Sequence, residues 1–268
     1  MALWIGTSGW SYPHWDRVLY PPGLRPVDRL AVYTNVFRSV ELNASFYRWP
    51  RDSSFRSWAR RLPADFVMSV KAPRGLTHGA KLYRPERWVE RIRRCWHELG
   101  GRRGVLLTQL PAGLARDDGR LEYFLSCVPG WLRVAVEFRH HSWHDDTVFA
   151  LLERYGVGYC VISGAGLPCV LRATAPFVYI RLHGPDPERL YAGSYPDADL
   201  AWWAARVAEW RTAGRDVYAY FNNDGDGYAV HNARRLNELS ASSTGARATM
   251  ERPRRPSGPV RRSSSAGH

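Results

Sequence analysis

The feature of this sequence that most constrains its fold is a repeated alternation of short apolar runs with amphipathic stretches. The apolar runs are rich in β-branched residues and most end at a polar side chain, as residues 134–138 do at Glu137 and Arg139. Such runs are typical of strands buried on both faces of a parallel sheet. The predicted strands are residues 3–7, 39–42, 66–70, 105–110, 134–138, 157–162, 177–182 and 216–221.

Helical stretches follow most of these strands. Eight strands alternating with helices predict an α/β fold, namely a single (β/α)8 barrel of the TIM type over residues 1–239. The connection at 164–176 has no helical period, so we expect the barrel to be irregular between its sixth and seventh strands. An open doubly wound sheet would need a glycine-rich phosphate loop, which residues 6–9 are too sparse in glycine to supply. The predicted helices are residues 28–37, 53–62, 85–99, 119–128, 145–155, 197–213 and 228–239.

The chain is strongly basic, with a net charge of +13, which favours nucleic-acid binding as one function. Residues 240–268 are predicted to be a disordered, Arg- and Ser-rich tail, and about +5 of the charge lies there. The 38 basic residues include two lysines, Lys71 and Lys81, and the remainder are arginines. This bias looks compositional, because many of the arginines lie on helices where a solvated face explains them.

The sequence also predicts where the protein resides. No apolar run reaches the ~20 residues that a membrane-spanning helix needs. The N-terminus lacks the basic and apolar regions of a signal peptide. The four cysteines have no CxxC spacing, which is typical of buried thiols in a reducing compartment. We therefore expect a cytoplasmic protein with no membrane partner.

Several short motifs punctuate the chain, at residues 6–12, 40–47, 70–72, 77–78, 109–111, 136–140, 181–184 and 221–223. In this order they resemble the domain-of-unknown-function 72 (DUF72, YecE-like) family, over about residues 4–239. The resemblance implies a TIM-type barrel. The activity of the family is not established, so the resemblance implies no reaction. The chain departs from the family pattern at His141, where proline is common, and at Ser163, where an acidic residue is expected.

In a TIM-type barrel, the C-terminal ends of the strands converge on one face, where active sites form. The polar residues at the predicted strand ends are therefore candidates for a shared pocket. The candidate catalytic residues are Glu41, Lys71, Glu137 and His183. The candidate substrate-binding residues are Trp10, Tyr12, Asn43, Tyr47, Gln109, Arg139, Trp143, Arg181, Tyr195, Asn222 and Asn223.

The charged candidates allow more than one interpretation. Glu41 and Glu137 could divide the roles of general acid and base. Alternatively, each could neutralise a neighbouring cation such as Lys71 or Arg181. A lysine in so arginine-rich a chain suggests a need for an amine, as a Schiff-base former, a proton shuttle or a compact donor. Arg139 and Arg181 could clamp a phosphate or carboxylate, or form salt bridges at the strand ends.

The remaining candidates suit a polar ligand. His183 could be a general base, or with both glutamates a ligand of a divalent metal. No His, Asp or Glu spacing is diagnostic of a metal site, so no cofactor is expected. The aromatic candidates suit a sugar or a nucleobase. Tyr191 and Tyr195 could form a lid, whereas His78 is interpreted as a packing residue of its loop.

These observations favour a soluble enzyme, a hydrolase or an isomerase. Its expected substrate is a polar, sugar-like or phosphorylated small molecule, bound at the C-terminal ends of the strands. Two alternatives remain open, a nucleic-acid binding or processing protein and a non-catalytic small-molecule binder.

Overall fold

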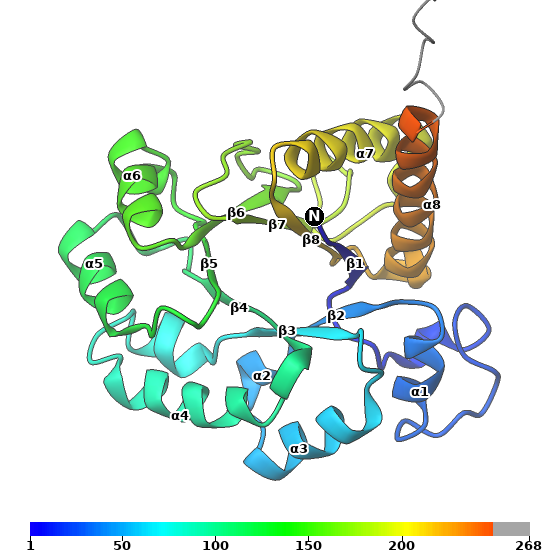
Figure 1. Ribbon diagram of the computed structural model, residues 1–268, viewed down its shortest axis with the longest axis horizontal. Helices are drawn as coiled ribbons and strands as arrows, with labels where there is room; N and C mark the ends of the chain where they lie inside the picture. The colour runs from blue at the N-terminus through cyan, green and yellow to red at the C-terminus, as the bar shows by residue number, and fades with distance from the viewer. Residues whose placement is uncertain (249–268) are drawn as a thin grey trace, which may run out of the picture.

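Eight parallel strands form one sheet that curves around on itself, with helices on its outside (Figure 1). The order of the strands is β1-β8-β7-β6-β5-β4-β3-β2. This computed structural model describes residues 1–248, with side chains to residue 242. The predicted (β/α)8 barrel is therefore confirmed. The strands are β1 (Leu3–Thr7), β2 (Ser39–Leu42), β3 (Val67–Lys71), β4 (Arg103–Gln109), β5 (Val134–Glu137), β6 (Gly158–Ser163), β7 (Phe177–Leu182) and β8 (Asp216–Phe221).

The helices lie close to their predicted ranges. A four-residue helix after β2 and a π-helix at Gly75–Gly79 after β3 were not predicted. Helix α3 begins at Asp52, one residue before its predicted start. The α-helices are α1 (Arg29–Thr34), α2 (Ala44–Tyr47), α3 (Asp52–Arg61), α4 (Glu86–His97), α5 (Asp118–Cys127), α6 (Asp146–Arg154), α7 (Asp197–Thr212) and α8 (Tyr228–Ala248).

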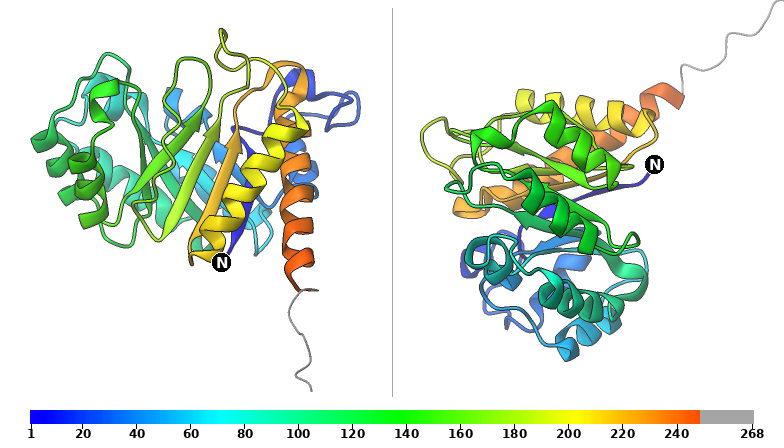
Figure 2. Two further views of the ribbon diagram at one scale, coloured as in Figure 1. Left: turned by 90° about the horizontal axis from the view of Figure 1, so that it is seen from above. Right: turned by 90° about the vertical axis from the view of Figure 1, so that its left-hand side faces the viewer.

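Two irregularities concern the predicted boundaries. Residues 164–176 join β6 to β7 without a helix, which confirms the expected interruption. Helix α8 continues to Ala248, so the helix does not end at residue 239 as the sequence suggested. The end of α8 lies at the same end of the barrel as the N-terminus (Figure 2). The opposite end, where the C-terminal ends of the strands meet, is called the mouth of the barrel. The rest of the predicted tail, 249–268, lies outside the described residues.

The interior of the barrel is filled by alternate residues of each strand, because successive side chains of a strand point to opposite faces. Its lower part is aromatic: Trp4 stacks on Tyr218 with ring centroids 4.5 Å apart, and Phe177 meets Tyr218 edge-on at 5.9 Å. Toward the C-terminal ends the inward residues become polar, and Tyr179 is followed on β7 by Arg181. The mouth of the barrel therefore has a polar floor that rests on an aromatic layer.

The barrel closes between β1 and β2, where Gly9 N donates to the carbonyl of Glu41 at 2.8 Å. Closer to the N-terminal ends of these two strands, the hydroxyl of Tyr33 on α1 bridges β1 and β2 in place of direct backbone hydrogen bonds. It accepts from Thr7 N at 3.1 Å and donates to the Ser39 carbonyl at 3.0 Å. Gly6 also belongs to this seam, since a Cβ there would lie 2.1 Å from the Ser39 oxygen. One tyrosine thus satisfies two buried backbone groups that would otherwise lack partners.

The part of the chain that the structure describes contains no helix both long and apolar enough to cross a membrane. All four cysteines are free thiols, and Cys95 and Cys160 are buried as predicted. Cys169 is exposed, because it lies in the helix-free connection between β6 and β7.

Replacing Tyr33 by Phe should lower the free energy of unfolding by ~1–3 kcal/mol, because Thr7 N–H and the Ser39 carbonyl lose their buried partner. Urea unfolding of both proteins measures this difference. Tyr47→Phe is the matched control, since that side chain is 78% exposed. Equal stability of the two variants would show that the hydroxyl of Tyr33 does not hold the seam.

Candidate functional site

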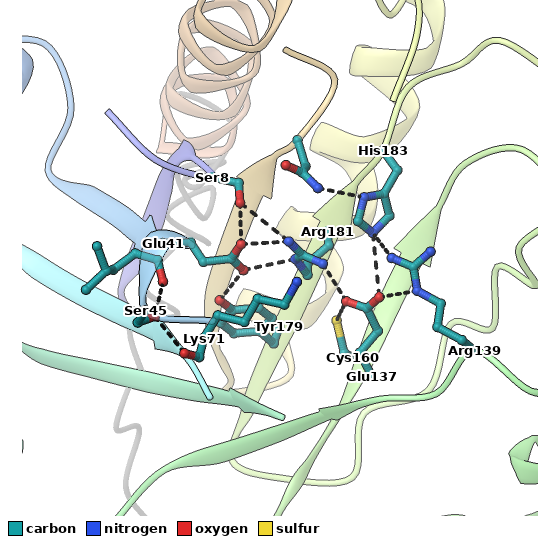
Figure 3. Close-up of polar contacts among 12 residues, drawn as sticks. Ser8, Glu41, Ser45, Lys71, Glu137, Arg139, Cys160, Tyr179, Arg181 and His183 are labelled. Atoms are coloured by element: carbon teal, nitrogen blue, oxygen red, sulfur yellow. Dashed lines mark hydrogen bonds and ion pairs between the residues drawn. The ribbon is translucent and has the colours of Figure 1, made fainter. Parts of the chain in front are cut away.

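The guanidinium of Arg181 lies at the centre of the mouth and joins both candidate glutamates (Figure 3). Its Nε and Nη2 bind the carboxylate of Glu41 at 3.0 and 2.8 Å. Its Nη1 binds Glu137 Oε2 at 2.7 Å. All three side chains are buried, and they come from β7, β2 and β5. A single cation therefore links three strands across the barrel.

Glu41 has no oxygen left for a substrate. Oε1 accepts from Ser8 Oγ at 2.5 Å and from Arg181, while Oε2 accepts from the Tyr179 hydroxyl at 2.7 Å and again from Arg181. Two bonds to each oxygen satisfy a carboxylate. The geometry therefore favours the interpretation in which Glu41 neutralises a cation, and that cation is Arg181.

Glu137 is also held as an anion. Oε2 accepts from Arg181, and Oε1 forms an ion pair with Arg139 Nε. Burial opposes ionisation, but the charges of Arg181 and then Arg139 outweigh it and hold the pKa of Glu137 well below its ordinary value of 4.5. Glu137 is therefore a charged partner of two guanidiniums and not a proton donor at neutral pH.

His183 follows β7 and is fully buried as a neutral imidazole. Burial, and then the charge of Arg181, lower its pKa well below 6.5. Arg139 Nη2 lies 3.1 Å from its Nε2, and Asn222 contacts its Nδ1 at 3.2 Å. Because a guanidinium can only donate, Nε2 is the accepting nitrogen. Both ring nitrogens are thus engaged, so His183 orients Arg139 and is not a free base.

Lys71 differs from its neighbours in the mouth. Among the described residues its Nζ has no hydrogen-bond or ion-pair partner, and it lies 4.2 Å from the centroid of the Phe46 ring. Burial, and then the charge of Arg181, lower the pKa of Lys71 from 10.5 to about 8. The carboxylates of Glu137 and Glu41 raise the pKa of Lys71, but they offset only part of the lowering, because guanidiniums already pair with them. Lys71 therefore offers an amine with a shifted pKa and no internal partner.

His78 lies on the π-helix and shares the Phe46 ring with this amine, although the sequence favoured a packing role over contact with a substrate. Its ring packs edge-on against Phe46 at 4.9 Å. Thr77 Oγ1 contacts Nδ1 at 2.9 Å, and Nε2 has no hydrogen-bond partner within the described residues. Burial, and then the charge of Lys71, lower the pKa of His78 below 6.5. The Phe46 ring thus contacts both the unpaired amine of Lys71 and the imidazole of His78.

A cavity of about 370 Å³ lies at the C-terminal ends of β1 and β2, where its lining includes Gly9 and Leu42, the residues that follow Ser8 and Glu41. The Oδ1 atom of Asn43 is buried without a hydrogen-bond partner, so it is an acceptor available to a ligand. The cavity contains the predicted residues Trp10, Tyr12, Asn43 and Tyr47, and its lining is completed by Gly9, Ser11, Leu42 and Ala44.

Three predicted binding residues lie away from the mouth. Trp143 is buried, stacks on Phe138 and donates to the Leu114 carbonyl at 2.8 Å. Tyr195 donates to Ser163 Oγ at 3.2 Å and borders a different cavity. Asn223 donates to Asn232 and to the Gly193 carbonyl. The chain leaves the barrel axis after each strand, so these side chains support the loops instead of facing the pocket.

The other predicted residues lie at or near the mouth. Gln109 ends β4 half-buried, in register with Glu137. The Tyr191 ring meets the His183 ring edge-on, with centroids 5.2 Å apart. Ser8, Tyr179, Phe46 and His78 were missed as site residues. Tyr179 lies on β7 two positions before Arg181, so a period-two reading of that strand would have found it, whereas Ser8 directly follows the end of β1.

The described residues contain no group of three or more His, Cys, Asp or Glu side chains arranged to hold a metal ion. The carboxylate oxygens of Glu41 and Glu137 and the Nε2 atom of His183 could act as metal ligands. They instead accept hydrogen bonds from Arg181 and Arg139. We derive no step through a metal.

Replacing Arg181 by Met should lower the free energy of unfolding by ~3–5 kcal/mol, because two buried carboxylates lose their shared partner. Chemical denaturation at pH 7 gives the value. The control is Arg189→Met, which removes an exposed pair with Asp186 and should change stability by less than ~1 kcal/mol. Similar effects of the two substitutions would contradict the central role of Arg181.

Lys71→Met should stabilise the protein at pH 7 by roughly 1–3 kcal/mol. The folded pKa of about 8 lies below the ordinary 10.5, so the ammonium form opposes folding at pH 7. Between pH 8 and 10.5 the unfolded chain binds more protons, and this penalty disappears. The gain should therefore shrink as the pH rises to 10.5, as urea unfolding across this range would measure. Lys81→Met, on the surface, should show no such gain.

Comparisons with known proteins agree with this architecture. The sequence model of a family described as "Protein of unknown function DUF72" matches residues 4–257. The chain is 26% identical to the UPF0759 protein YunF of Bacillus subtilis, over 88% of this chain and 94% of YunF. A DUF72 family protein (TM1631) from Thermotoga maritima is 28% identical and superimposes with a TM-score of 0.80, covering 89% of this chain and 99% of that one.

The likeness to a second, more distant structure supports the fold. It is a DUF72 family protein (EF0366) from Enterococcus faecalis, 16% identical, with a TM-score of 0.79 over 89% of this chain and 95% of that one. Since the family match extends over nearly the whole barrel, the predicted resemblance is confirmed: the chain belongs to the DUF72 family of proteins of unknown function.

Proposed function

We propose that the barrel mouth is the active site of an enzyme that catalyses proton transfer on a polar, anionic small molecule such as a sugar phosphate. The observation that carries this proposal is the unpaired amine of Lys71 inside a cluster whose other charged groups are all paired. A buried cation with a shifted pKa and no internal partner is a feature of functional sites more than of structural ion pairs.

The charges of the cluster favour an anionic ligand. Two carboxylates, Glu41 and Glu137, balance two guanidiniums, Arg139 and Arg181. Protonated Lys71 then adds a positive charge without a counterion. A phosphate or carboxylate near Nζ would supply that counterion. The cavity at the C-terminal ends of β1 and β2 offers Asn43 for a hydroxyl and aromatic faces for the carbon skeleton.

Within the two predicted reaction classes, the geometry favours an isomerase over a hydrolase. Glycoside hydrolysis by two carboxylates requires one of them as a proton donor. Glu137 is held ionised by Arg181 and Arg139, and each oxygen of Glu41 already accepts two hydrogen bonds. Isomerisation next to a carbonyl needs one base and one group that stabilises negative charge on oxygen. His78 Nε2 and Lys71 Nζ are the groups available for these roles.

The test follows hydrogen exchange, because an isomerase that removes a proton next to a carbonyl incorporates deuterium from heavy water. A panel of aldose and ketose phosphates is incubated with the protein in heavy water and followed by NMR. We expect exchange in at least one compound, and a loss of ~100-fold or more in Lys71→Met, in line with the size of acid–base effects. Lys81→Met should retain the wild-type rate.

The outcomes separate the alternatives. Exchange at the same rate in Lys71→Met would contradict a role for this amine. Ligands that raise the melting temperature without any exchange would instead support the non-catalytic binder. Steeply salt-dependent binding of single-stranded DNA, with no response to the sugar phosphates, would favour the nucleic-acid alternative.

A further inference from the structure

We propose that Lys71 reacts covalently with its substrate as a Schiff base, so that the substrate class is an aldehyde or ketone carrying a phosphate or carboxylate group. This inference rests on the proposed function, since it concerns the same pocket. It adds the bond that forms there and the functional group that the substrate must carry.

The first support is the freedom of the amine. A nucleophilic lysine has to approach a carbonyl carbon without first breaking strong internal contacts. Glu41 and Glu137 are the anions that could have held Lys71, but Arg181 binds both of them, and Ser8 and Tyr179 complete the shell of Glu41. What Lys71 touches is the face of Phe46, a weak contact that a substrate can replace.

The second support is the protonation state. An ammonium group is not a nucleophile, so the neutral amine must be accessible near neutral pH. Burial beside fixed guanidiniums lowers the pKa of Lys71 to about 8. About one molecule in ten then carries a neutral amine at pH 7, whereas an ordinary lysine is neutral about once in several thousand.

The third support is the choice of residue. Nearly every other cation of this chain is an arginine, and arginine could bind an anion or pair with a glutamate at least as well. What an arginine cannot do at neutral pH is lose its proton and attack a carbonyl. The retention of an amine at the centre of an arginine-rich mouth is explained by covalent chemistry.

The step balances without an oxidant, a reductant or a cofactor. The lone pair of Nζ forms the N–C bond while the carbonyl π electrons move to oxygen, which takes a proton and gives a carbinolamine. The C–O bond then breaks, the oxygen leaves as water, and a C=N bond forms. Overall, one amine, one carbonyl and one proton give one iminium ion and one water.

The neighbouring imidazole fits the proton transfers that this sequence needs. His78 Nε2 is unpaired within the described residues, and its lowered pKa keeps it neutral at pH 7. It can accept a proton from the nitrogen of the carbinolamine and pass it to the departing oxygen, so that it is neutral again when it takes a proton from the carbon next to the iminium. Water then protonates the same carbon on its opposite face while His78 returns its proton to solvent, and hydrolysis of the C=N bond releases an epimer and restores Lys71.

The experiment traps the iminium in the full-length chain with sodium borohydride. The probes are dihydroxyacetone phosphate and pyruvate, which separate phosphate from carboxylate recognition. Glycerol 3-phosphate, which lacks a carbonyl, and hydroxyacetone, which lacks an anionic group, are the controls. Peptide mass mapping then compares Lys71 with Lys81, the other lysine of the chain and an exposed one.

We expect at least a tenfold excess of reduced adduct on Lys71 over Lys81 at pH 7.5 with at least one anionic probe. The labelling of Lys71 should rise with pH and level off above about 8, following its pKa. Glycerol 3-phosphate should give no adduct, and hydroxyacetone should label Lys71 less than the anionic probes do.

Equal labelling of the two lysines, or no labelling of Lys71 by either anionic probe, would overturn the covalent step. The results that would contradict the proposed isomerase activity differ from those that would contradict the Schiff base. If Lys71-dependent deuterium exchange persists while borohydride traps nothing during that exchange, proton transfer stands and the Schiff base does not. If Lys71 is trapped but no compound exchanges deuterium, the amine is reactive and the isomerase assignment is wrong.

Discussion

The arrangement of the mouth depends on one buried guanidinium. Arg181 presents a planar fork that meets Glu41 through two nitrogens and reaches Glu137 through a third. A lysine at this position would offer a single nitrogen and could not hold both carboxylates in a fixed plane. Burial of three charges is favourable only when their hydrogen bonds are nearly complete, and Ser8, Tyr179 and Arg139 supply the remaining partners. This completeness leaves Lys71 without a partner.

Much of the fold could be predicted, because the alternation of apolar strands and amphipathic helices is a local property of the sequence. The convergence of Glu41, Lys71, Glu137, Arg139, Arg181 and His183 could also be predicted, since it follows from the parallel arrangement of the strands. Which of these charged side chains form ion pairs with one another could not be predicted from the sequence. It depends on side-chain rotamers and on the stagger between β2, β5 and β7, and a sequence does not display either one.

The errors have a common physical cause. Beyond the last residue of a strand, the regular alternation of inward and outward side chains ends. Asn222 therefore contacts His183, while Asn223 donates to the side chain of Asn232 and supports a loop. Trp143 and Tyr195 lie farther along such loops and are buried by them. Conversely, Tyr179 was overlooked because it lies below the end of β7, although it is two positions before Arg181 and shares its face.

The lower layers of the barrel contribute to the lowered pKa of Lys71. Trp4, Phe177 and Tyr218 fill the space beneath the polar floor with rings, so solvent does not reach the cluster from below. Burial limits the water that could stabilise an ammonium ion at Lys71, which is 8% exposed, and the fixed guanidinium of Arg181 disfavours a second positive charge. The same burial weakens the fold at neutral pH and increases the fraction of neutral amine. A lysine that opposes folding where its neutral form is most populated is what the proposed covalent step requires.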